Sequence, residues 1–449
     1  MYQDTKTIER WSQELRARDA LAPELYDTYG VKRGLRDKNG KGVLAGLTGI
    51  SQVQGKRQAD GQEVPCEGRL YYRGYSVFDL VRGESSSRHC LAEECAYLLL
   101  FGSLPDREQL AEFQDALAQS RTLPQNFTRD VIMKAPTSDI MNTLTRSVLT
   151  LSAYDDKAMD NSLPNVLRQS LMLIGTLPMM SVYGYHAYNH YCRDGSFYIH
   201  HPDENLTLAE NLLMMLRPDR KFSTLEAQVL DLALVLHMEH GGGNNSAFTT
   251  HVVTSAGSDT YSVMAAALCS LKGPKHGGAN LKVVGMMDDL RAQVTDQGDR
   301  EQVEEYLTQV LHGEAFDRAG LIYGMGHAVY SLSDPRAVIF KNFVKRLAQE
   351  KGRQEEYELY ATVEELAPQV ITRERRIYKG VCANVDFYSG FVYRMLDIPE
   401  ELFTPIFAIA RMVGWSAHRM EELINTDKII RPAYQSVCPA REYLPIDQR

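Results

Sequence analysis

The 449-residue sequence lacks the cysteine pattern of a secreted domain and the long apolar run of a membrane protein. Its seven cysteines are scattered, odd in number and without a CxxC pair, so no disulfide framework is expected. No stretch approaches the roughly 18 apolar residues of a membrane-spanning helix. The charged start, MYQDTKTIERW, is not followed by the apolar segment of a secretory signal. We therefore expect a cytoplasmic protein without a membrane partner.

The sequence also lacks an excess of basic residues. It has 49 Lys and Arg against 58 Asp and Glu, a net charge of −9, which argues against nucleic acid as a partner. Hydrophobic residues make up 44% and charged residues 24% of the chain, which is typical of a globular protein. The length is enough to bury a sizeable core.

Sustained alternation of strand and helix patterns is missing, so a doubly wound α/β fold is not expected. From Ala92 onward, helical segments with Pro or Gly at their ends follow one another, and several are apolar on nearly every side, as in a buried helical body. Before them, GVLAGLTGISQV and GRLYYRGYSVFDLV predict small strands or turns. The pattern around Lys6–Ala20 predicts a helix. The fold class is therefore mostly α.

The last apolar helix, TPIFAIARMVGWSAHRMEEL, is predicted to begin with Thr404 as its N-cap and Pro405 at its first position. Arg411 lies in its middle, with no acidic residue three or four positions away. A buried guanidinium needs an anionic partner. Two interpretations remain open: a ligand supplies that charge, or the arginine is paired within the core or reaches solvent.

His276 lies among small residues in LKGPKHGGAN, just before a helix predicted to start near Gly278. The positive end of a helix favours a neutral imidazole, which can donate a hydrogen bond to a carbonyl. The alternative is an ordinary polar turn histidine. Local chemistry alone leaves that alternative ahead.

The segment LHMEHGGGNNSAFTTH holds His237, Glu239 and His240. The two histidines are one helical turn apart and could share a face as a zinc pair. A metal-dependent hydrolase is disfavoured, however, because the HExxH pattern is missing. His240 directly precedes Gly241–Gly243, so its ring could point into space left by the backbone.

Two further segments offer chemistry. YGMGHAVYSLSDPRA contains His327 and Arg336, and its Gly324 and Gly326 permit close approach of the backbone. In NVDFYSGFVY, Asp386 lies among apolar and aromatic residues. Such surroundings raise the pKa of a carboxyl and make it a stronger base, although a helix-capping role is equally open.

Taken in order, these segments resemble the citrate synthase family, including the 2-methylcitrate synthases. The resemblance extends from about residue 43 to residue 435, and the ordered set is far more specific than any single motif. It comprises GRLYYRGYSVFDL, AEECAYLLLFGSLP, HMEHGGGNNSAFT, LKGPKHGGAN, GMGHAVYSLSDPRA, NVDFYSG, FAIARMVGWSAH and Arg431–Pro432.

The resemblance implies a citrate-synthase-like fold and a homodimer. It implies a large discontinuous helical domain, residues 1–280 and 391–449. It also implies a smaller helical domain, residues 281–390, that closes over the site and excludes water. The more charged helical stretches at 288–315 and 346–366 fall in the smaller domain.

The resemblance also implies an activity: oxaloacetate and acetyl-CoA condense, and hydrolysis of citryl-CoA releases citrate and CoA, a tricarboxylic acid cycle reaction. Acetyl-CoA is a co-substrate, and no metal or tightly bound cofactor is implied.

The catalytic residues would be Asp386 as base, His276 as stabiliser of the enol and His327 as acid toward the ketone. Substrate carboxylates suit bidentate guanidinium groups; the implied substrate-binding residues are His240, Arg336, Arg411 and, from the other subunit, Arg431. The implied CoA-binding residues are Gly324, Met325, Gly326 and Lys275.

Two alternatives stay open. A 2-methylcitrate synthase would use propionyl-CoA, and the one-methylene difference is worth only about 1–3 kcal/mol of discrimination. A non-catalytic paralogue would bind metabolites and regulate a partner. Ala328, Ser331 and Ala433 stand where many relatives carry basic residues for CoA phosphates, and Lys272 or Lys275 would have to replace them.

Overall fold

A computed structural model describes residues 5–37, 40–82, 90–376 and 380–448. The chain divides into two compact units, Met1–Gly46 with Arg431–Arg449, and Leu47–Ile430. The smaller unit contains α1 (Thr5–Asp19) and α2 (Pro23–Thr28), neither of which buries a residue. Helix α1 confirms the helix predicted around Lys6–Ala20. The C-terminal part of this unit is largely irregular and exposed.

The larger unit begins with a small antiparallel sheet in the order β1-β2-β3. Its strands are β1 (Ser51–Ala59), β2 (Gln62–Tyr72) and β3 (Tyr75–Ser76). They confirm the strands expected in this region. The prediction was wrong for its last residues, because Val77–Arg82 form helix α3 and bury Val77 and Leu80, which lie three residues apart on one helical face.

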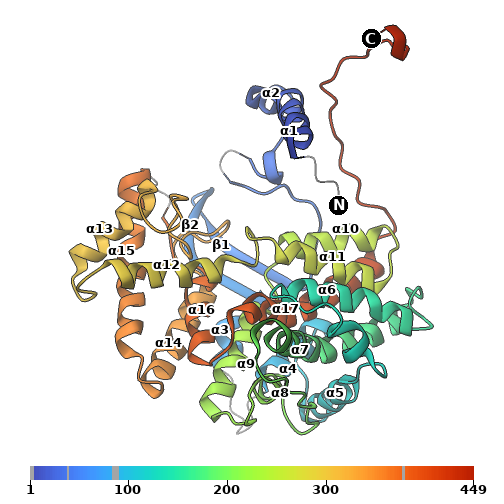
Figure 1. Ribbon diagram of the computed structural model, residues 1–449, viewed down its shortest axis with the longest axis vertical. Coiled ribbons are helices and arrows are strands. Elements are labelled where there is room, and N and C mark those ends of the chain that lie inside the picture. Colours follow the sequence, from blue (N-terminus) through green and yellow to red (C-terminus); the bar gives the residue numbers. More distant parts are fainter. Residues whose placement is uncertain (1–4, 38–39, 83–89, 377–379, 449) are drawn as a thin grey trace. The chain divides into compact units, whose positions relative to one another are not determined.

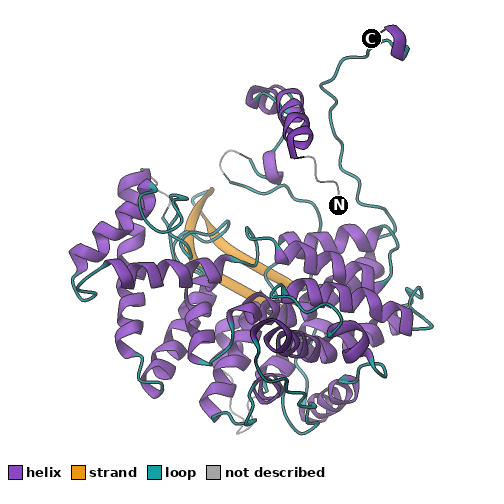
Figure 2. Cartoon of the chain, in the orientation of Figure 1, coloured by secondary structure: helices purple, strands orange, loops and turns teal. Residues whose placement is uncertain are grey.

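The rest of the larger unit is helical, which confirms the predicted fold class (Figures 1 and 2). Side chains of Asp106, Thr207 and Ser223 form capping boxes that define three helix starts. The helices are α4 (Leu91–Phe101), α5 (Arg107–Ser120), α6 (Ile140–Leu151), α7 (Leu163–Arg193), α8 (Leu208–Leu216), α9 (Thr224–Met238), α10 (Asn245–Ser255), α11 (Thr260–Lys272), α12 (Ala279–Gln293), α13 (Arg300–His312), α14 (Pro335–Glu350), α15 (Gln354–Arg375), α16 (Val385–Met395) and α17 (Phe403–Asn425).

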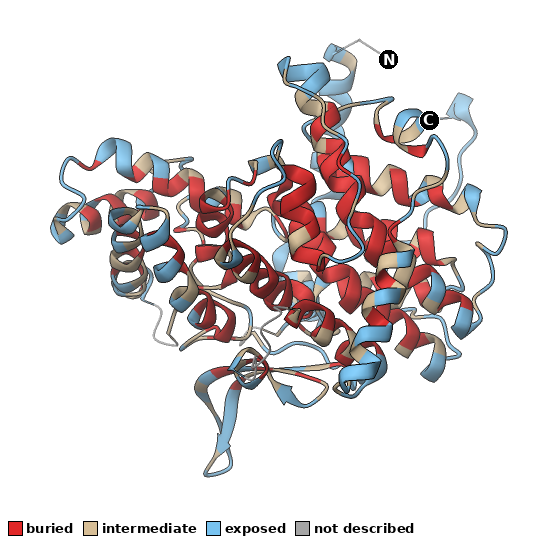
Figure 3. Cartoon of the chain, turned by 90° about the horizontal axis from the view of Figure 1, so that it is seen from below, coloured by how far each residue is buried: buried red, intermediate tan, exposed pale blue. Residues whose placement is uncertain are grey.

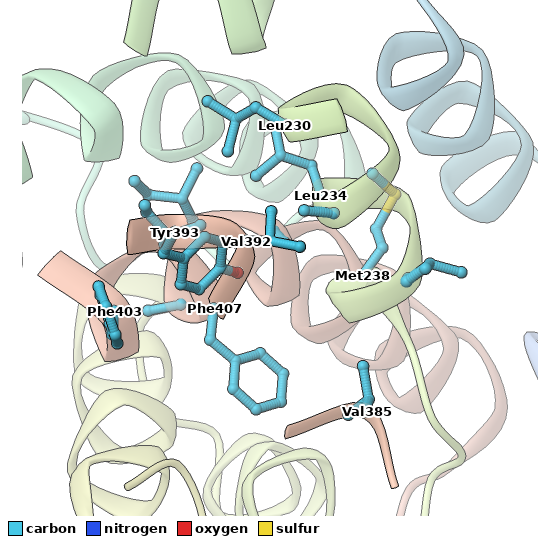
Figure 4. Packing of buried hydrophobic residues seen from close by; sticks show 14 of the residues in the cluster. Leu230, Leu234, Met238, Val385, Val392, Tyr393, Phe403 and Phe407 are labelled. Carbon is cyan, nitrogen blue, oxygen red and sulfur yellow. The ribbon is translucent and has the colours of Figure 1, made fainter. Parts of the chain in front are cut away.

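Helix α17 lies at the centre of the core, and every residue from Phe403 to Met420 is buried. Figure 3 shows that buried residues are concentrated on the interior helices. It contacts α4, α7, α9 and α10. Figure 4 shows Phe403 and Phe407 of α17 beside Tyr393 of α16, with Leu234 of α9 in the same cluster. Each such side chain contributes about 1.5–3 kcal/mol through burial, which stabilises the position of α17 in the core. None of the described helices is long and apolar enough to span a membrane.

The predicted start of α17 was wrong. The helix begins at Phe403, after a 3₁₀ turn at Glu400–Leu402, and no side chain caps it. The Thr404 hydroxyl donates instead to the carbonyl oxygen of Gly277, at 3.0 Å. The hydroxyl therefore bonds to a group distant in the sequence and does not cap the helix. This hydrogen bond connects the segment that contains His276 to the core.

Candidate active site

Arg411 is fully buried in the middle of α17. Its Nε donates to the carbonyl oxygen of His237 at 2.7 Å, and its carbon Cζ lies 4.9 Å from the centre of the Phe407 ring. Nη1 and Nη2 have no hydrogen-bond partner among the described residues. Burial lowers the pKa of Arg411 to about 10, against the attraction of Glu239. The group therefore remains a cation at neutral pH, with two donors available to an anion.

The segment after α9 sets the position of His240. The helix ends at Met238 and Glu239 is extended, with φ −153°. His237 and His240 therefore do not share a helical face, the possibility that the sequence had left open. His237 is buried against Phe407, with ring centres 4.4 Å apart. Burial holds its pKa well below the usual range. The geometry that motivated a zinc pair is absent from this described segment.

His240 lies beside other rings instead. Its Nε2 is 3.3 Å from the Tyr330 hydroxyl, and its ring centre is 5.0 Å from that of His327. Burial, followed by the nearby Arg336, holds the pKa of His240 well below its usual range. The imidazole is therefore neutral at physiological pH.

His276 lies in the turn just before α12, whose N-cap is Gly278, as predicted. Its Nε2 is 3.1 Å from the Ser246 hydroxyl oxygen, and that oxygen accepts a hydrogen bond from the indole N–H of Trp415 at 3.1 Å. Burial, and then the charge of Arg411, lowers the pKa of His276 to about 4. The ring is neutral, as expected, but burial is the main cause.

Two glycines hold the segment before His327 against the segment before Asp386. Gly324 and Gly326 have φ of +78° and +88°. Met325 forms an antiparallel bridge with Ala383, and the Gly326 amide donates to Cys382 at 2.8 Å. A Cβ on Gly324 would come within 2.8 Å of the Phe387 ring. Both the conformation and the close approach therefore require glycine at 324.

Hydrogen bonds also fix the ring of His327. Its Nδ1 accepts from the amides of Val329 at 3.0 Å and Tyr330 at 3.2 Å. An accepting Nδ1 carries no proton, so the proton of the neutral ring is on Nε2. His327 consequently presents an N–H donor from Nε2.

Arg336 has a partner of its own. It forms two hydrogen bonds with Asp334, Nε to Oδ1 at 3.0 Å and Nη2 to Oδ2 at 2.7 Å, and both side chains are nearly inaccessible. The carboxylate of Asp334 raises the pKa of Arg336, against the effect of burial. This pair orients one edge of the guanidinium.

Asp386 lies in the first turn of α16 but does not cap it. The cap is Asn384, whose side chain accepts from the Asp386 amide at 3.0 Å. Oδ1 of Asp386 is buried without a partner among the described residues. Burial raises the pKa of Asp386 to about 6, although Arg336 opposes the shift. The capping alternative is therefore excluded, and the carboxylate is available as a base.

The structure thus brings most of the predicted site residues into one electrostatically connected group. Arg336 and Arg411 both act on the pKa of Asp386 and of His240. Arg411 also acts on His276. Arg431 belongs to the smaller unit, where it is exposed.

The lysines considered for CoA differ. Lys272 forms an ion pair with Asp139. Lys275 is exposed in the turn before His276, and no ion pair or hydrogen bond of its side chain occurs among the described contacts.

The family profile described as citrate synthase, C-terminal domain, matches residues 35–433. The chain belongs to the citrate synthase family. This is an enzyme family, and the membership confirms the resemblance found in the sequence. The citrate synthase of Synechocystis sp. is 34% identical over 412 residues, covering 91% of this chain and 92% of the relative. The 2-methylcitrate synthase 1 of Corynebacterium glutamicum is 32% identical over 425 residues, covering 93% and 98%.

Solved citrate synthases share the fold. The enzyme from Pyrobaculum aerophilum superposes with a TM-score of 0.75 at 30% identity, covering 92% of this chain and 95% of that one. The Thermoplasma acidophilum citrate synthase, in ternary complex with carboxymethyl coenzyme A and oxaloacetate, also gives 0.75 at 27% identity, covering 93% and 99%.

Sequence reasoning missed several supporting residues of this citrate synthase family site. Ser246 and Trp415 contact each other beside His276, and Asp334 holds Arg336. Glu239 accepts from the Ser51 hydroxyl, the Gly241 amide and His418 Nε2. The Asp334–Arg336 and Glu239–Gly241 pairs, each two residues apart, were visible locally; the other partners are distant in the sequence.

Proposed function

We propose that the protein condenses oxaloacetate with acetyl-CoA and hydrolyses citryl-CoA to citrate and CoA. One observation carries the proposal: among the described residues, two buried donors of Arg411 and the buried Oδ1 of Asp386 have no hydrogen-bond partner, and the charge of Arg411 lowers the pKa of Asp386. Two substrates suit this combination: one that brings carboxylates to the arginine, and one that brings an acidic C–H next to a carbonyl to the aspartate. The Thermoplasma relative binds oxaloacetate and a CoA derivative.

Asp386 serves as the general base. Its carboxylate takes a proton from the methyl carbon of the thioester, and the electron pair of that C–H bond forms the enol double bond. A base with a pKa near 6 is matched to neutral pH better than an ordinary aspartate. The polarity of this step requires a donor at the thioester oxygen.

His276 serves as that donor. Its neutral ring can donate through Nδ1 when the Ser246 hydroxyl donates to Nε2. The Trp415 N–H already occupies one acceptor site of Ser246. Neutral imidazole stabilises the enolate oxygen by hydrogen bonding, without full proton transfer.

His327 serves as the acid toward the ketone. As the enol carbon attacks the carbonyl carbon of oxaloacetate, the ketone oxygen gains charge, and the Nε2–H of His327 supplies a proton to it. Its accepting contacts from Val329 and Tyr330 keep that proton on Nε2. Water then cleaves the thioester of citryl-CoA and CoA leaves as the thiol.

The remaining roles are binding. Arg411, Arg336 and His240 bind the carboxylates and the keto group of oxaloacetate. For CoA, Gly324, Met325 and Gly326 offer backbone close to Asp386, and Lys275 offers an exposed cation near His276. These assignments rest on the contacts described above and on the family resemblance.

Steady-state kinetics identify which acyl-CoA is the preferred substrate. Purified protein is assayed for kcat/KM with acetyl-CoA and with propionyl-CoA, both with oxaloacetate. We expect acetyl-CoA to be preferred. A propionyl-CoA preference would replace citrate by 2-methylcitrate, the alternative that the Corynebacterium relative keeps open. Absence of CoA release with either substrate would favour the non-catalytic paralogue.

We further propose that the protein is a cytoplasmic homodimer in which Arg431 enters the partner's site. Co-expression of differently tagged Arg431→Ala and Asp386→Asn chains tests this assignment. If Arg431 acts across the interface, mixed dimers contain one complete site and recover activity. If it acts within its own chain, neither site is complete, and the mixed dimers stay inactive.

We also propose that residues 281–390, which lie in the larger unit, form a separate small domain that closes on substrate. His327, Arg336 and Asp386 lie in this range, whereas His240, His276 and Arg411 lie outside it. Small-angle scattering with and without oxaloacetate tests closure. We expect a smaller radius of gyration with the substrate, and an unchanged radius would contradict closure.

A further inference from the structure

A second histidine cluster lies where α10 contacts α17, apart from the residues assigned to chemistry. His251 of α10 and His418 of α17 approach each other, with Nε2 of His251 3.1 Å from Nδ1 of His418. Glu421, one helical turn after His418, places Oε2 3.8 Å from the same Nδ1. The three ligand atoms lie within 4.8 Å of one another.

Each ring has a carboxylate on its outer nitrogen. His251 Nδ1 is 2.7 Å from Oε2 of Glu422, and His418 Nε2 is 3.0 Å from Oε1 of Glu239. When each neutral ring directs its proton to its carboxylate, both inner nitrogens hold lone pairs that face one another. Carboxylates in this outer position orient metal-binding histidines and increase their basicity.

We propose that His251 Nε2, His418 Nδ1 and Glu421 Oε2 form a binding site for a divalent transition metal ion, with Zn²⁺ as the probe. Two imidazole nitrogens on tetrahedral zinc, each about 2.05 Å from the ion, lie about 3.3 Å apart, close to the 3.1 Å seen here. Imidazole and carboxylate ligands suit this class of metal.

The surroundings of Glu421 support the assignment. Its Oε1 accepts from the Gly49 amide at 2.7 Å, which fixes the carboxylate. Its Oε2 is buried and has no hydrogen-bond partner among the described residues. A cavity of 520 Å³, lined by His251, Glu421 and Glu422 among others, gives an ion access and leaves room for water as a fourth ligand.

The proposed site adjoins the loop that carries His240. A Cβ on Gly242 would lie 3.3 Å from Cε1 of His418 and 3.5 Å from Nε2 of His251. Glu239, which accepts from His418, also accepts from the Gly241 amide. A bound ion would therefore brace this loop, so its binding should raise the thermal unfolding midpoint. This inference does not depend on the proposed reaction.

Metal content tests the site directly. The full-length protein is stripped with EDTA, dialysed against Zn²⁺ and analysed by mass spectrometry of the metal, with affinity measured by competition with a chromophoric chelator. We expect one tightly held zinc per chain in the wild type. Affinity should fall at least 100-fold in His251→Gln and Glu421→Gln, and about 10–100-fold in Glu422→Gln, which removes an orienting carboxylate.

The control is His312→Gln. His312 forms a similar pair with Glu374 on the surface, at 3.1 Å, so its loss should leave zinc content unchanged. Co²⁺ in the wild type should show the visible absorption of a four-coordinate imidazole site, a readout that needs no variant. The proposal would be overturned if the wild type retained no zinc, or if His251→Gln and the wild type retained equal amounts. The contact between the two rings would then be an ordinary hydrogen bond.

Discussion

Arg411 and Arg419 are two buried arginines on the same helix, eight residues apart, with opposite surroundings. Both are fully buried and burial lowers the pKa of each to about 10. Arg419 donates from all three nitrogens, to Thr260, Thr254, Asn161 and the carbonyl oxygen of Ser258. Arg411 uses only Nε, and its two terminal nitrogens have no partner within the described chain.

This difference separates a structural cation from a binding cation. A buried charge left without partners destabilises the fold, and a network of satisfied donors offsets that desolvation. Arg419 joins α17 to the α10–α11 region. Arg411 has two donors without a partner among the described residues, and its charge acts on Asp386, whose Oδ1 likewise has no described partner. Substitutions should therefore affect activity at one site and stability at the other.

The largest effect on activity is expected for Asp386→Asn. This substitution removes the proposed base from the candidate active site, to which Arg411 belongs and Arg419 does not. We expect kcat to fall by about 10²–10⁴-fold, with the Kd for oxaloacetate nearly unchanged. Steady-state kinetics and calorimetric binding measure the two quantities. Wild-type turnover in this variant would show that Asp386 is not the base.

Arg411→Gln comes next. The lost charge-assisted hydrogen bonds are worth about 1.5–3 kcal/mol each, so kcat/KM should fall by roughly 10²–10⁴-fold, while the thermal midpoint stays or rises. Arg419→Gln is the matched control and should keep wild-type KM values. Equal kinetic losses in both variants would erase the distinction between the two arginines.

Stability should show the reverse order. Arg419→Gln removes donors from buried hydroxyl and carbonyl partners, and at about 1 kcal/mol for each bond we expect a loss of about 2–4 kcal/mol in unfolding free energy. Urea denaturation measures this loss for both variants. An Arg411→Gln protein less stable than Arg419→Gln would contradict the structural role of Arg419.

A smaller effect, whose direction is fixed by the raised pKa, is expected in the pH dependence of the unfolding free energy. The folded pKa of Asp386, about 6, exceeds the usual value for an unfolded aspartate, about 3.9. Its stabilising contribution is therefore present below pH 4 and is lost as pH rises through 6. Asp386→Asn should exceed the wild type in unfolding free energy by up to about 2–3 kcal/mol at pH 8. The excess should vanish toward pH 4, and a pH-independent difference would refute the raised pKa.

The sequence determined much of this protein. Apolar periodicity and Pro or Gly stops predicted the helical body, and the ordered motifs identified the family together with its candidate residues. Local patterns also had limits. The prediction of Thr404 as an N-cap was wrong, because its hydroxyl donates to the Gly277 carbonyl oxygen. The sequence left open whether Asp386 caps its helix, and the structure places Asn384 in that position. Short-range rules fail where a distant group competes for the same hydrogen bond.

Only the tertiary structure decided what the buried charges are for. Arg411 and Arg419 are both arginines on an apolar helix, and their sequence neighbourhoods do not reveal which has partners. His251 and His418 are 167 residues apart and meet only because α10 contacts α17. Hydrogen bonding and desolvation depend on which atoms surround a group in space, whereas the sequence orders those atoms along the chain alone.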